Sequence, residues 1–268
     1  YEQEEKNNEE FAKLLSELGD IYINDAFSCS HRKQSSVHKI TSFVKDCYAG
    51  PLFKKEIKAI EMVIQSKKKP VTCVIGGSKV STKIGVISNL IKKVDNLVIV
   101  GAMANNFLLY KGCKVGKSLI EENSKSTIKK LYDLANENNC EIIIPLDCTV
   151  SESTSGKPFQ IELDHIKDNQ IILDIGPKSI NFISKKINES NTVLWNGPAG
   201  YFENENFSKG TMSIAEILSN NTEKKSLISV LGGGDTLAAI SKSKNKLSFS
   251  HLSTAGGAFL EYLEGKDL

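Results

Sequence analysis

Hydrophobic and polar residues alternate along this chain at two different spacings, and the spacing changes at Pro70. Before Pro70, apolar side chains recur every three or four residues over 4–18 and again over 52–65, which predicts two helices. An apolar run over 21–27 predicts a short strand that leads into a polar loop over 28–36. Because the helix over 52–65 lies between a short first segment and a long second one, we interpret it as a connector between domains.

After Pro70 the chain repeats a strand, a glycine-rich turn and a helix. Continuous apolar strands that alternate with amphipathic helices are typical of a parallel sheet covered on both faces. We therefore predict an α/β protein, with a three-layer doubly wound parallel sheet and a fragment of a second α/β domain before it. Five apolar runs predict the buried strands, at 71–75, 97–100, 141–145, 192–195 and 229–231.

Composition excludes several classes of protein. Of the 268 residues, 40% are hydrophobic and 25% charged, which is ordinary for a globular chain and excludes disorder and fibres. The 34 basic and 32 acidic side chains give a net charge of +2, without the clustered basic excess of a nucleic-acid-binding surface. No apolar run approaches the roughly 20 residues that span a bilayer. The six cysteines lack the spacing of a zinc site, so we expect unpaired thiols and a cytoplasmic location.

A single arginine, Arg32, stands among many lysines, and it lies in the polar loop over 28–36. A planar guanidinium can hold an anion through two parallel hydrogen bonds, which a lysine cannot do. The loop is therefore a candidate anion site. Two alternatives stay open: a solvated surface loop, and chance survival of one arginine in a lysine-rich composition.

Glycine- or amide-rich loops follow four of the five predicted strands. In a parallel sheet, ligands bind outside the carboxyl ends of the strands, so we expect the function to reside in these loops. A fifth glycine-containing stretch, 112–118, resembles a P-loop but has one residue too few between its glycines and no strand before it. We interpret that stretch as a turn between helices. The four loops are Gly76-Gly-Ser-Lys79, Gly101-Ala-Met-Ala-Asn105, Asn196-Gly-Pro-Ala-Gly200 and Gly232-Gly-Gly-Asp235.

The first of these loops continues into Lys79-Val-Ser-Thr-Lys83, where we expect a helix to begin. Glycines let a ligand approach the backbone, and the free N–H groups at a helix start attract anions. Lys79 and Lys83 would lie one turn apart on one face, which favours two cations aimed at one phosphate chain. The alternative is a pair of solvated surface lysines.

The later loops add polar groups that suit a nucleotide. The amide of Asn196 could donate to a phosphate, and Glu203 could accept from ribose hydroxyls, although both could also belong to a rigid turn. Asp235 could hold Mg²⁺ together with phosphate oxygens, or could only cap a helix. Residues 253–258 offer backbone N–H donors to a second anion, or form a plain glycine turn.

Five motifs in this order resemble phosphoglycerate kinase, and the resemblance covers essentially the whole chain. It implies an N-terminal domain that binds 3-phosphoglycerate and a C-terminal domain that binds Mg-ADP or Mg-ATP, with closure about a hinge. It divides the chain into the end of the N-terminal domain (1–49), a connecting helix (50–69), the nucleotide domain (70–250) and a hinge-side phosphate loop with its helix (251–268). The motifs are Asn24-Asp-Ala-Phe with His31-Arg32, Gly76-Gly-Ser-Lys-Val-Ser-Thr-Lys83, Trp195-Asn-Gly-Pro-Ala-Gly-Tyr-Phe-Glu203, Gly232-Gly-Gly-Asp-Thr236 and Ser253-Thr-Ala-Gly-Gly-Ala258.

The resemblance also implies roles for individual residues. Arg32, Lys83, Gly256 and Gly257 would act on the moving phosphoryl group, and Asp235 would bind Mg²⁺. Substrate contacts would come from Asn24, Asp25, His31 and Arg32. The nucleotide would be held by Gly77, Lys79, Lys83, Gly101, Asn196, Pro198, Glu203, Gly233, Gly234, Asp235 and Thr236.

The expected function is therefore reversible, direct in-line transfer of a phosphoryl group between 1,3-bisphosphoglycerate and ADP, giving 3-phosphoglycerate and ATP in glycolysis. We expect a cytoplasmic monomer that binds neither nucleic acid nor membrane. Because the family's opening segments would precede Tyr1 and its tail would follow Leu268, we expect this chain alone to bind Mg-nucleotide but to be weakly active or inactive. Two alternatives are a non-catalytic nucleotide-binding remnant that acts as an interaction protein, and an unrelated α/β sugar-phosphate enzyme.

Overall fold

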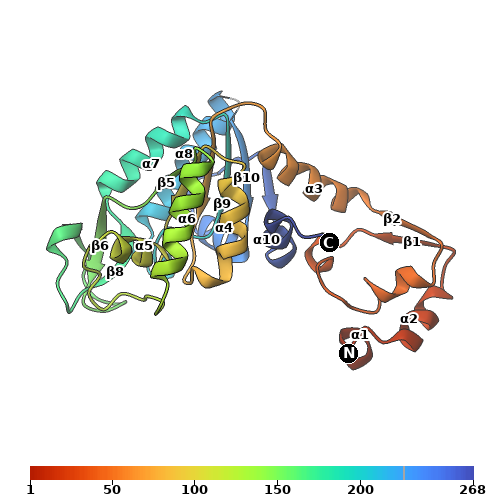
Figure 1. Cartoon of the computed structure of the whole chain (residues 1–268). Coiled ribbons are helices and arrows are strands. Elements are labelled where there is room, and N and C mark those ends of the chain that lie inside the picture. Colours follow the sequence, from red (N-terminus) through yellow and green to blue (C-terminus); the bar gives the residue numbers. More distant parts are fainter. Residues whose placement is uncertain (226) are drawn as a thin grey trace.

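The computed structural model describes residues 1–225 and 227–268 and consists of a large α/β body and a smaller N-terminal segment (Figure 1). Helix α3 (Pro51–Ile64) runs between the two parts, as the sequence predicted. None of the helices in these described ranges is long and apolar enough to cross a membrane. The division of the chain into four parts stays a prediction.

The N-terminal segment begins with two short helices, where the sequence predicted one helix over 4–18. That prediction was wrong, because Asn7 adopts a φ of 51° and ends α1 (Glu2–Glu5). Asn8 then starts α2 (Glu9–Ser16), since its side chain accepts a hydrogen bond from the Phe11 N–H at 2.8 Å. The rest of the segment contains β1 (Ile21–Asn24), two short 3₁₀ turns, η1 (Phe27–Cys29) and η2 (Lys39–Ser42), and β2 (Asp46–Ala49).

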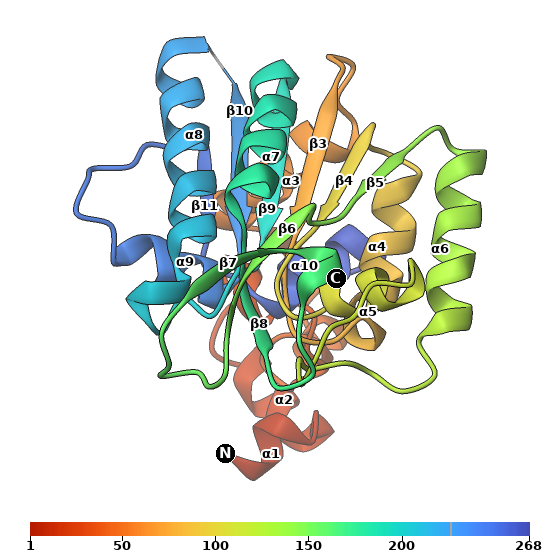
Figure 2. The same ribbon diagram turned by 90° about the vertical axis from the view of Figure 1, so that its left-hand side faces the viewer.

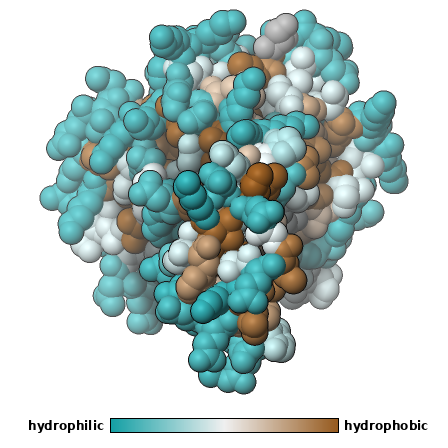
Figure 3. Space-filling model, turned by 90° about the vertical axis from the view of Figure 1, so that its right-hand side faces the viewer, coloured by the Kyte–Doolittle hydropathy of each residue, from teal (hydrophilic) through white to brown (hydrophobic). Residues whose placement is uncertain are grey.

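Strands β1 and β2 form a two-stranded parallel sheet that leaves apolar side chains exposed. Ile21, Ile23 and Tyr48 are 60%, 59% and 57% exposed, and Figure 3 shows apolar surface among polar side chains on this side of the molecule. Phe27 of this segment is buried and packs edge-on against Phe53 of α3, with ring centroids 5.4 Å apart. The segment is therefore held to the large body through η1 and α3.

The large body is built on a six-stranded parallel sheet in the order β11-β10-β9-β3-β4-β5. The five strands predicted from apolar runs are all present. The sixth, β11, lies in the 251–268 segment and pairs with β10 at the edge of the sheet. The strand bounds are β3 (Val71–Ile75), β4 (Asn96–Ile99), β5 (Glu141–Ile143), β9 (Thr192–Asn196), β10 (Ile228–Gly232) and β11 (His251–Ser253).

Helices cover both faces of this sheet, which confirms the predicted three layers. Successive strand residues point to opposite faces, so Cys73 joins the core under one helical layer and Val74 joins the core under the other. Figure 2 shows α7 and α8 on the near side of the sheet, with α3 and α10 behind it. The first layer contains α3, α4 (Ile84–Ile91), α6 (Lys125–Glu137) and α10 (Gly257–Glu264), and the second contains α7 (Pro177–Glu189) and α8 (Lys209–Lys225).

A second, antiparallel sheet lies beside the main one and was missed by the sequence interpretation. Its strands are β6 (Asp147–Ser151), β7 (Phe159–Glu162) and β8 (Ile171–Ile175), with β6 in the middle. Cys148, Val150 and Ile166 form its small core. The stretch 112–118 is a turn between α5 (Ala104–Tyr110) and α6, as predicted.

Asp25 ties the start of the connector helix to the end of β1, and its loss should lower stability. Its Oδ1 accepts a hydrogen bond from the Phe53 N–H at 2.9 Å, in the first turn of α3. We expect Asp25→Ala to lower the free energy of unfolding by about 1 kcal/mol, as for the loss of a helix cap. Urea unfolding measures this change. Asp20→Ala, which removes an exposed carboxylate from the same segment, is the matched control, and an equal loss in both variants would contradict the capping role.

Candidate functional site

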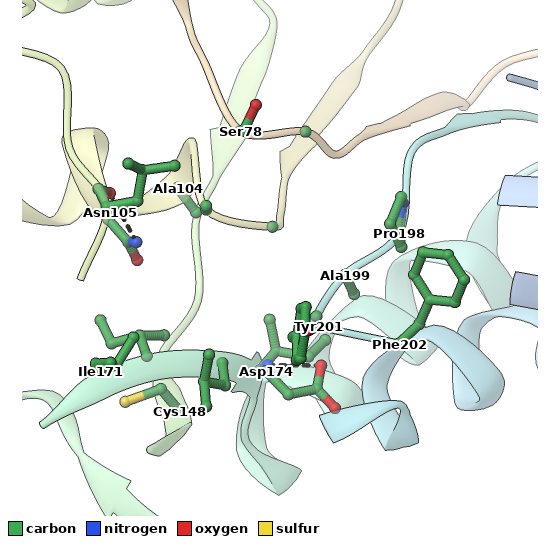
Figure 4. A pocket seen from close by; sticks show the side chains of 18 of the residues that line it. Ser78, Ala104, Asn105, Cys148, Ile171, Asp174, Pro198, Ala199, Tyr201 and Phe202 are labelled. Carbon is green, nitrogen blue, oxygen red and sulfur yellow. Dashed lines mark hydrogen bonds between the residues drawn. The ribbon is translucent and has the colours of Figure 1, made fainter. Parts of the chain in front are cut away.

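A pocket of about 390 Å³ opens where the loops after β3, β4, β9 and β10 meet. It is lined by Gly77, Gly101, Pro198, Glu203 and Asp235, all of which the sequence placed in a nucleotide site. Figure 4 shows Pro198 and Phe202 of the β9 loop on one side and Asn105 on the other. Four loops that are distant in the sequence therefore converge on one cavity at the carboxyl edge of the sheet.

The loops after β3 and β9 lie backbone against backbone, which explains their glycines. The Gly76 N–H donates to the carbonyl of Asn196 at 2.8 Å, and a Cβ on Gly76 would collide with the carbonyl of Pro198. Gly197, with a φ of +97°, faces Gly76 in turn and has no room for a Cβ either. Glycine is the residue that allows both the positive φ and the close approach.

Lys83 joins three of the four loops. Its Nζ donates to the carbonyl of Gly76 at 2.6 Å and to Oδ1 of Asn196 at 2.7 Å, and Nδ2 of Asn196 donates to the carbonyl of Gly232 at 2.9 Å. Burial lowers the pKa of Lys83 to about 8, and the nearby charge of Asp235 offsets part of that effect. A cation that is partly desolvated beside a carboxylate is well placed to bind the phosphates of a ligand.

Asn196 and Thr236 both have protein partners in this structure. Asn196 is buried between Lys83 and the β10 loop, where a Cβ on Gly233 would lie 2.7 Å from its Nδ2. Oγ1 of Thr236 accepts a hydrogen bond from the Gly197 N–H at 2.7 Å. The two side chains hold the loops in place, and direct contacts from either of them to a phosphate stay predictions.

The expectation that Lys79 and Lys83 share one face of a helix was wrong. Residues 81–83 form a 3₁₀ turn, the α-helix begins only at Ile84, and Lys79 is exposed ahead of both. The N–H groups of Val80 and Ser81 donate to the carboxylate of Glu121, with the Ser81 bond at 3.0 Å. The anion at this helix start is therefore the chain's own Glu121.

Glu121 is held as a carboxylate by its surroundings. Slight burial pushes its pKa up, but the hydrogen bonds from Ser81 and Val80 and the charge of Lys79 outweigh this effect and lower the pKa. The backbone N–H of Glu121 donates to Oδ1 of Asn106 at 2.8 Å, which anchors the residue near α5. The loop that carries Lys79 is thus tied to the chain that follows β4.

The N-terminal residues assigned to the substrate do not line this pocket. Asn24 uses its Oδ1 to accept from the Ala26 N–H at 3.0 Å, Asp25 caps α3, and Arg32 is exposed. His31 lies against Gly257, where a Cβ would come within 2.5 Å of its Nε2. Nδ1 of His31 is buried without a hydrogen-bond partner among the described residues.

The structure thus brings His31 together with the start of α10, across most of the length of the chain. Gly256 at the N-cap of α10 has open space where a Cβ would point, and Gly234 at the first residue of α9 (Gly234–Ser241) has the same. Asp235 lies in the first turn of α9, where Gly233 and not Asp235 is the N-cap. The roles of these residues toward a ligand stay predictions.

Sequence reasoning missed the wall that the antiparallel sheet contributes to the pocket. Asp174 of β8 lines this wall with only 2% exposure, and its two oxygens accept from the N–H groups of Gly210 and Ile175 at 2.8 and 2.9 Å. Burial raises the pKa of Asp174 to about 7, against the lowering effect of those two bonds. Asp174 is the one charged residue in the apolar run 171–175, and this feature of the sequence could have identified it as a candidate.

The residues present fit a magnesium ion that arrives with a nucleotide. Mg²⁺ in phosphate sites is bound by one or two carboxylates, phosphate oxygens and water, so a single aspartate suffices. Asp235 would supply that carboxylate, since it lies at the pocket wall, close enough to Lys83 to affect the pKa of the lysine. Over 1–225 and 227–268, no three His, Cys, Asp or Glu side chains cluster in the manner of an all-protein metal site.

Comparison with known proteins identifies the family. The family model for phosphoglycerate kinase matches residues 1–266. The chain belongs to the phosphoglycerate kinase family. Among relatives, it is 43% identical to the phosphoglycerate kinase of Chelativorans sp. over 267 residues (99% of this chain, 67% of the relative) and 43% identical to that of Wolbachia pipientis wMel over 270 residues (100% and 68%).

A solved structure shows the same relationship. Phosphoglycerate kinase from Coxiella burnetii superposes with a TM-score of 0.92 at 40% identity, covering 99% of this chain and 68% of that protein. The chain thus spans about two thirds of the length of its phosphoglycerate kinase relatives. The α/β fold and the family expected from the motifs are confirmed, and the interpretation as an unrelated sugar-phosphate enzyme was wrong.

The lowered pKa of Lys83 should make nucleotide binding depend on pH. With a pKa of about 8, Lys83 is charged at pH 7 and loses its proton as the pH rises past 8, whereas a bound phosphate favours the charged form. Binding of ADP at pH 8 should therefore take up about half a proton, and the affinity should fall by up to about tenfold per pH unit above pH 8. Calorimetry in buffers of different ionisation enthalpy measures the uptake.

Two variants test whether the proton is taken up by Lys83 or by a neighbouring group. Lys83→Met should abolish the uptake, whereas Lys79→Met, which removes an exposed lysine of the same loop, should retain it. Unchanged uptake in Lys83→Met would assign the proton to a different group.

Proposed function

We propose that this chain binds Mg-ADP and Mg-ATP in the pocket between the strand-end loops and carries the nucleotide side of the phosphoglycerate kinase reaction. In that reaction a phosphoryl group passes reversibly between 1,3-bisphosphoglycerate and ADP, giving 3-phosphoglycerate and ATP. The observation that carries the proposal is the convergence of four loops on one pocket, with Asp235 on its wall and Lys83 close enough to Asp235 for the two charges to interact.

The order of the strands supports one orientation of the nucleotide. Asp235 lines the pocket after β10, and Lys83, which contacts the loops after β3 and β9, lies close enough to Asp235 for their charges to interact. We therefore take the β10 side as the charged end of the pocket. The end beyond β4 is mostly apolar, lined by Leu108 and Leu119. We place the phosphates at the first end and the base at the second, with Glu203 available to the ribose between them.

To catalyse phosphoryl transfer, the protein must align the two substrates and neutralise the charge of the transferred group, and no covalent intermediate is required. Mg²⁺, when bound, neutralises charge on the phosphate oxygens. Lys83 would contribute a positive charge that is already oriented by Gly76 and Asn196, and oriented charge lowers the barrier without reorganisation. The backbone N–H groups at Gly256 and Gly257 and the guanidinium of Arg32 would face the phosphoglycerate, beside His31.

We also propose a cytoplasmic, monomeric protein, in keeping with a glycolytic family. The alternative, a non-catalytic nucleotide-binding remnant, is less well supported because the chain aligns along its full length with enzymes named phosphoglycerate kinase. Because this chain alone is expected to be weakly active or inactive, turnover is measured after the remaining third of the protein has been supplied from a phosphoglycerate kinase relative. A remnant would still bind nucleotide with no transfer.

Calorimetric titration of the chain with ADP, with and without Mg²⁺, tests the proposed site. We expect binding that tightens when Mg²⁺ is present and expect Asp235→Asn to remove most of that tightening, because the carboxylate is the chain's own ligand for the ion. Asp168→Asn, which changes an exposed aspartate outside the pocket, is the control. Absence of ADP binding by the folded chain would overturn the proposal.

A further inference from the structure

The side chain of Asn105 leaves one of its two polar atoms unused, and that atom is buried at the pocket wall. Nδ2 donates to the carbonyl of Leu119 at 3.0 Å, whereas Oδ1 finds no donor within the described residues 1–225 and 227–268. Asn105 is 1% exposed and lines the pocket. A buried acceptor without a donor is unfavourable, so a ligand that donates to Oδ1 gains affinity.

The orientation of this amide is set by the protein. If the amide were reversed, Oδ1 would face the carbonyl oxygen of Leu119, and two acceptors would meet. The group presented to the pocket is therefore an acceptor and not a donor. In Figure 4, Asn105 lies above Ile171 and across the pocket from Pro198 and Phe202.

The position of Asn105 matches the base end of a nucleotide. Asp235 follows β10 and Asn105 follows β4, and these strands are separated by β9 and β3. Three inter-strand spacings of about 4.8 Å amount to about 14 Å, comparable with an extended nucleoside diphosphate from base to terminal phosphate. Leu108, Leu119 and Ile172 line the pocket with Asn105 and provide apolar surface for a flat ring.

We propose that Asn105 determines the base specificity of the site, with Oδ1 accepting a hydrogen bond from the 6-amino group of adenine. A 6-oxo purine would place its own oxygen against Oδ1 and leave both acceptors without a donor, which the buried setting penalises. The proposal rests on the nucleotide site proposed above and adds the residue that distinguishes adenine from hypoxanthine.

Calorimetry with three Mg-bound diphosphates tests the proposal: ADP, inosine diphosphate and the diphosphate of unsubstituted purine riboside. We expect the unmodified chain to bind ADP at least about tenfold more tightly than inosine diphosphate, with the unsubstituted purine between them. Asn105→Ala should bring the ratio of ADP to inosine diphosphate affinity close to one.

Asn106→Ala is the matched control. Asn106 is equally buried, but its Oδ1 already accepts from the Glu121 N–H at 2.8 Å and from Oγ of Ser124 at 3.2 Å, and it does not line the pocket. This variant should lose stability and keep the base preference. If Asn105→Ala does not fold, the three-ligand series on the unmodified chain decides.

The outcomes separate this inference from the proposed function. Equal affinity of the unmodified chain for ADP and inosine diphosphate, or a preference that persists in folded Asn105→Ala, overturns the role of Asn105. Failure of all three diphosphates to bind the folded, unmodified chain contradicts the nucleotide site itself.

Discussion

The site depends on one partly buried lysine that forms hydrogen bonds to two loops at once. Nζ of Lys83 donates to the carbonyl of Gly76 after β3 and to the amide oxygen of Asn196 after β9. The amide nitrogen of Asn196 in turn donates to the carbonyl of Gly232 after β10. Burying an amine is unfavourable, as its lowered pKa shows, so the glycines and amides around it are needed to hold it. In the proposed function this cation, close to Asp235, exchanges protein oxygens for phosphate oxygens.

The N-terminal segment meets the large body through a small number of contacts. Phe27 packs on the connector helix, and His31 reaches Gly257 at the start of α10. Nε2 of His251 in β11 lies 2.9 Å from a carboxylate oxygen of Glu56 in α3, and both side chains are largely buried. The connector is thus fixed to the edge of the main sheet.

The main sheet could be predicted because its strands are continuous apolar runs with glycine loops at one end. The strand-end residues Gly77, Gly101, Pro198, Glu203 and Asp235 follow from that topology, and they do line one pocket. Local sequence also pointed to the connector helix. These features are decided by residues close together in the chain.

The remaining features depend on contacts between distant residues, or on local backbone geometry that the spacing of apolar residues does not show. Glu121, which follows α5 in the chain, accepts hydrogen bonds from the N–H groups of Val80 and Ser81 before α4. The N–H groups that the sequence suggested for phosphate therefore already have an acceptor. The break before α2 depends on the positive φ of Asn7 and the cap formed by Asn8, which the apolar spacing over 4–18 does not reveal. Strands β6 to β8 are short and partly polar, and their wall, with Asp174, was therefore missed.

We propose that loops from four strands act as one cradle for a nucleotide, with Lys83 and its partner Asn196 connecting three of them. Backbone amide chemical shifts of the isotope-labelled chain, followed while Mg-ADP is added, test it directly. The account predicts that amides after β3, β4, β9 and β10 shift together along a single binding curve. Shifts confined to one of these loops, or centred on the N-terminal segment, would contradict it.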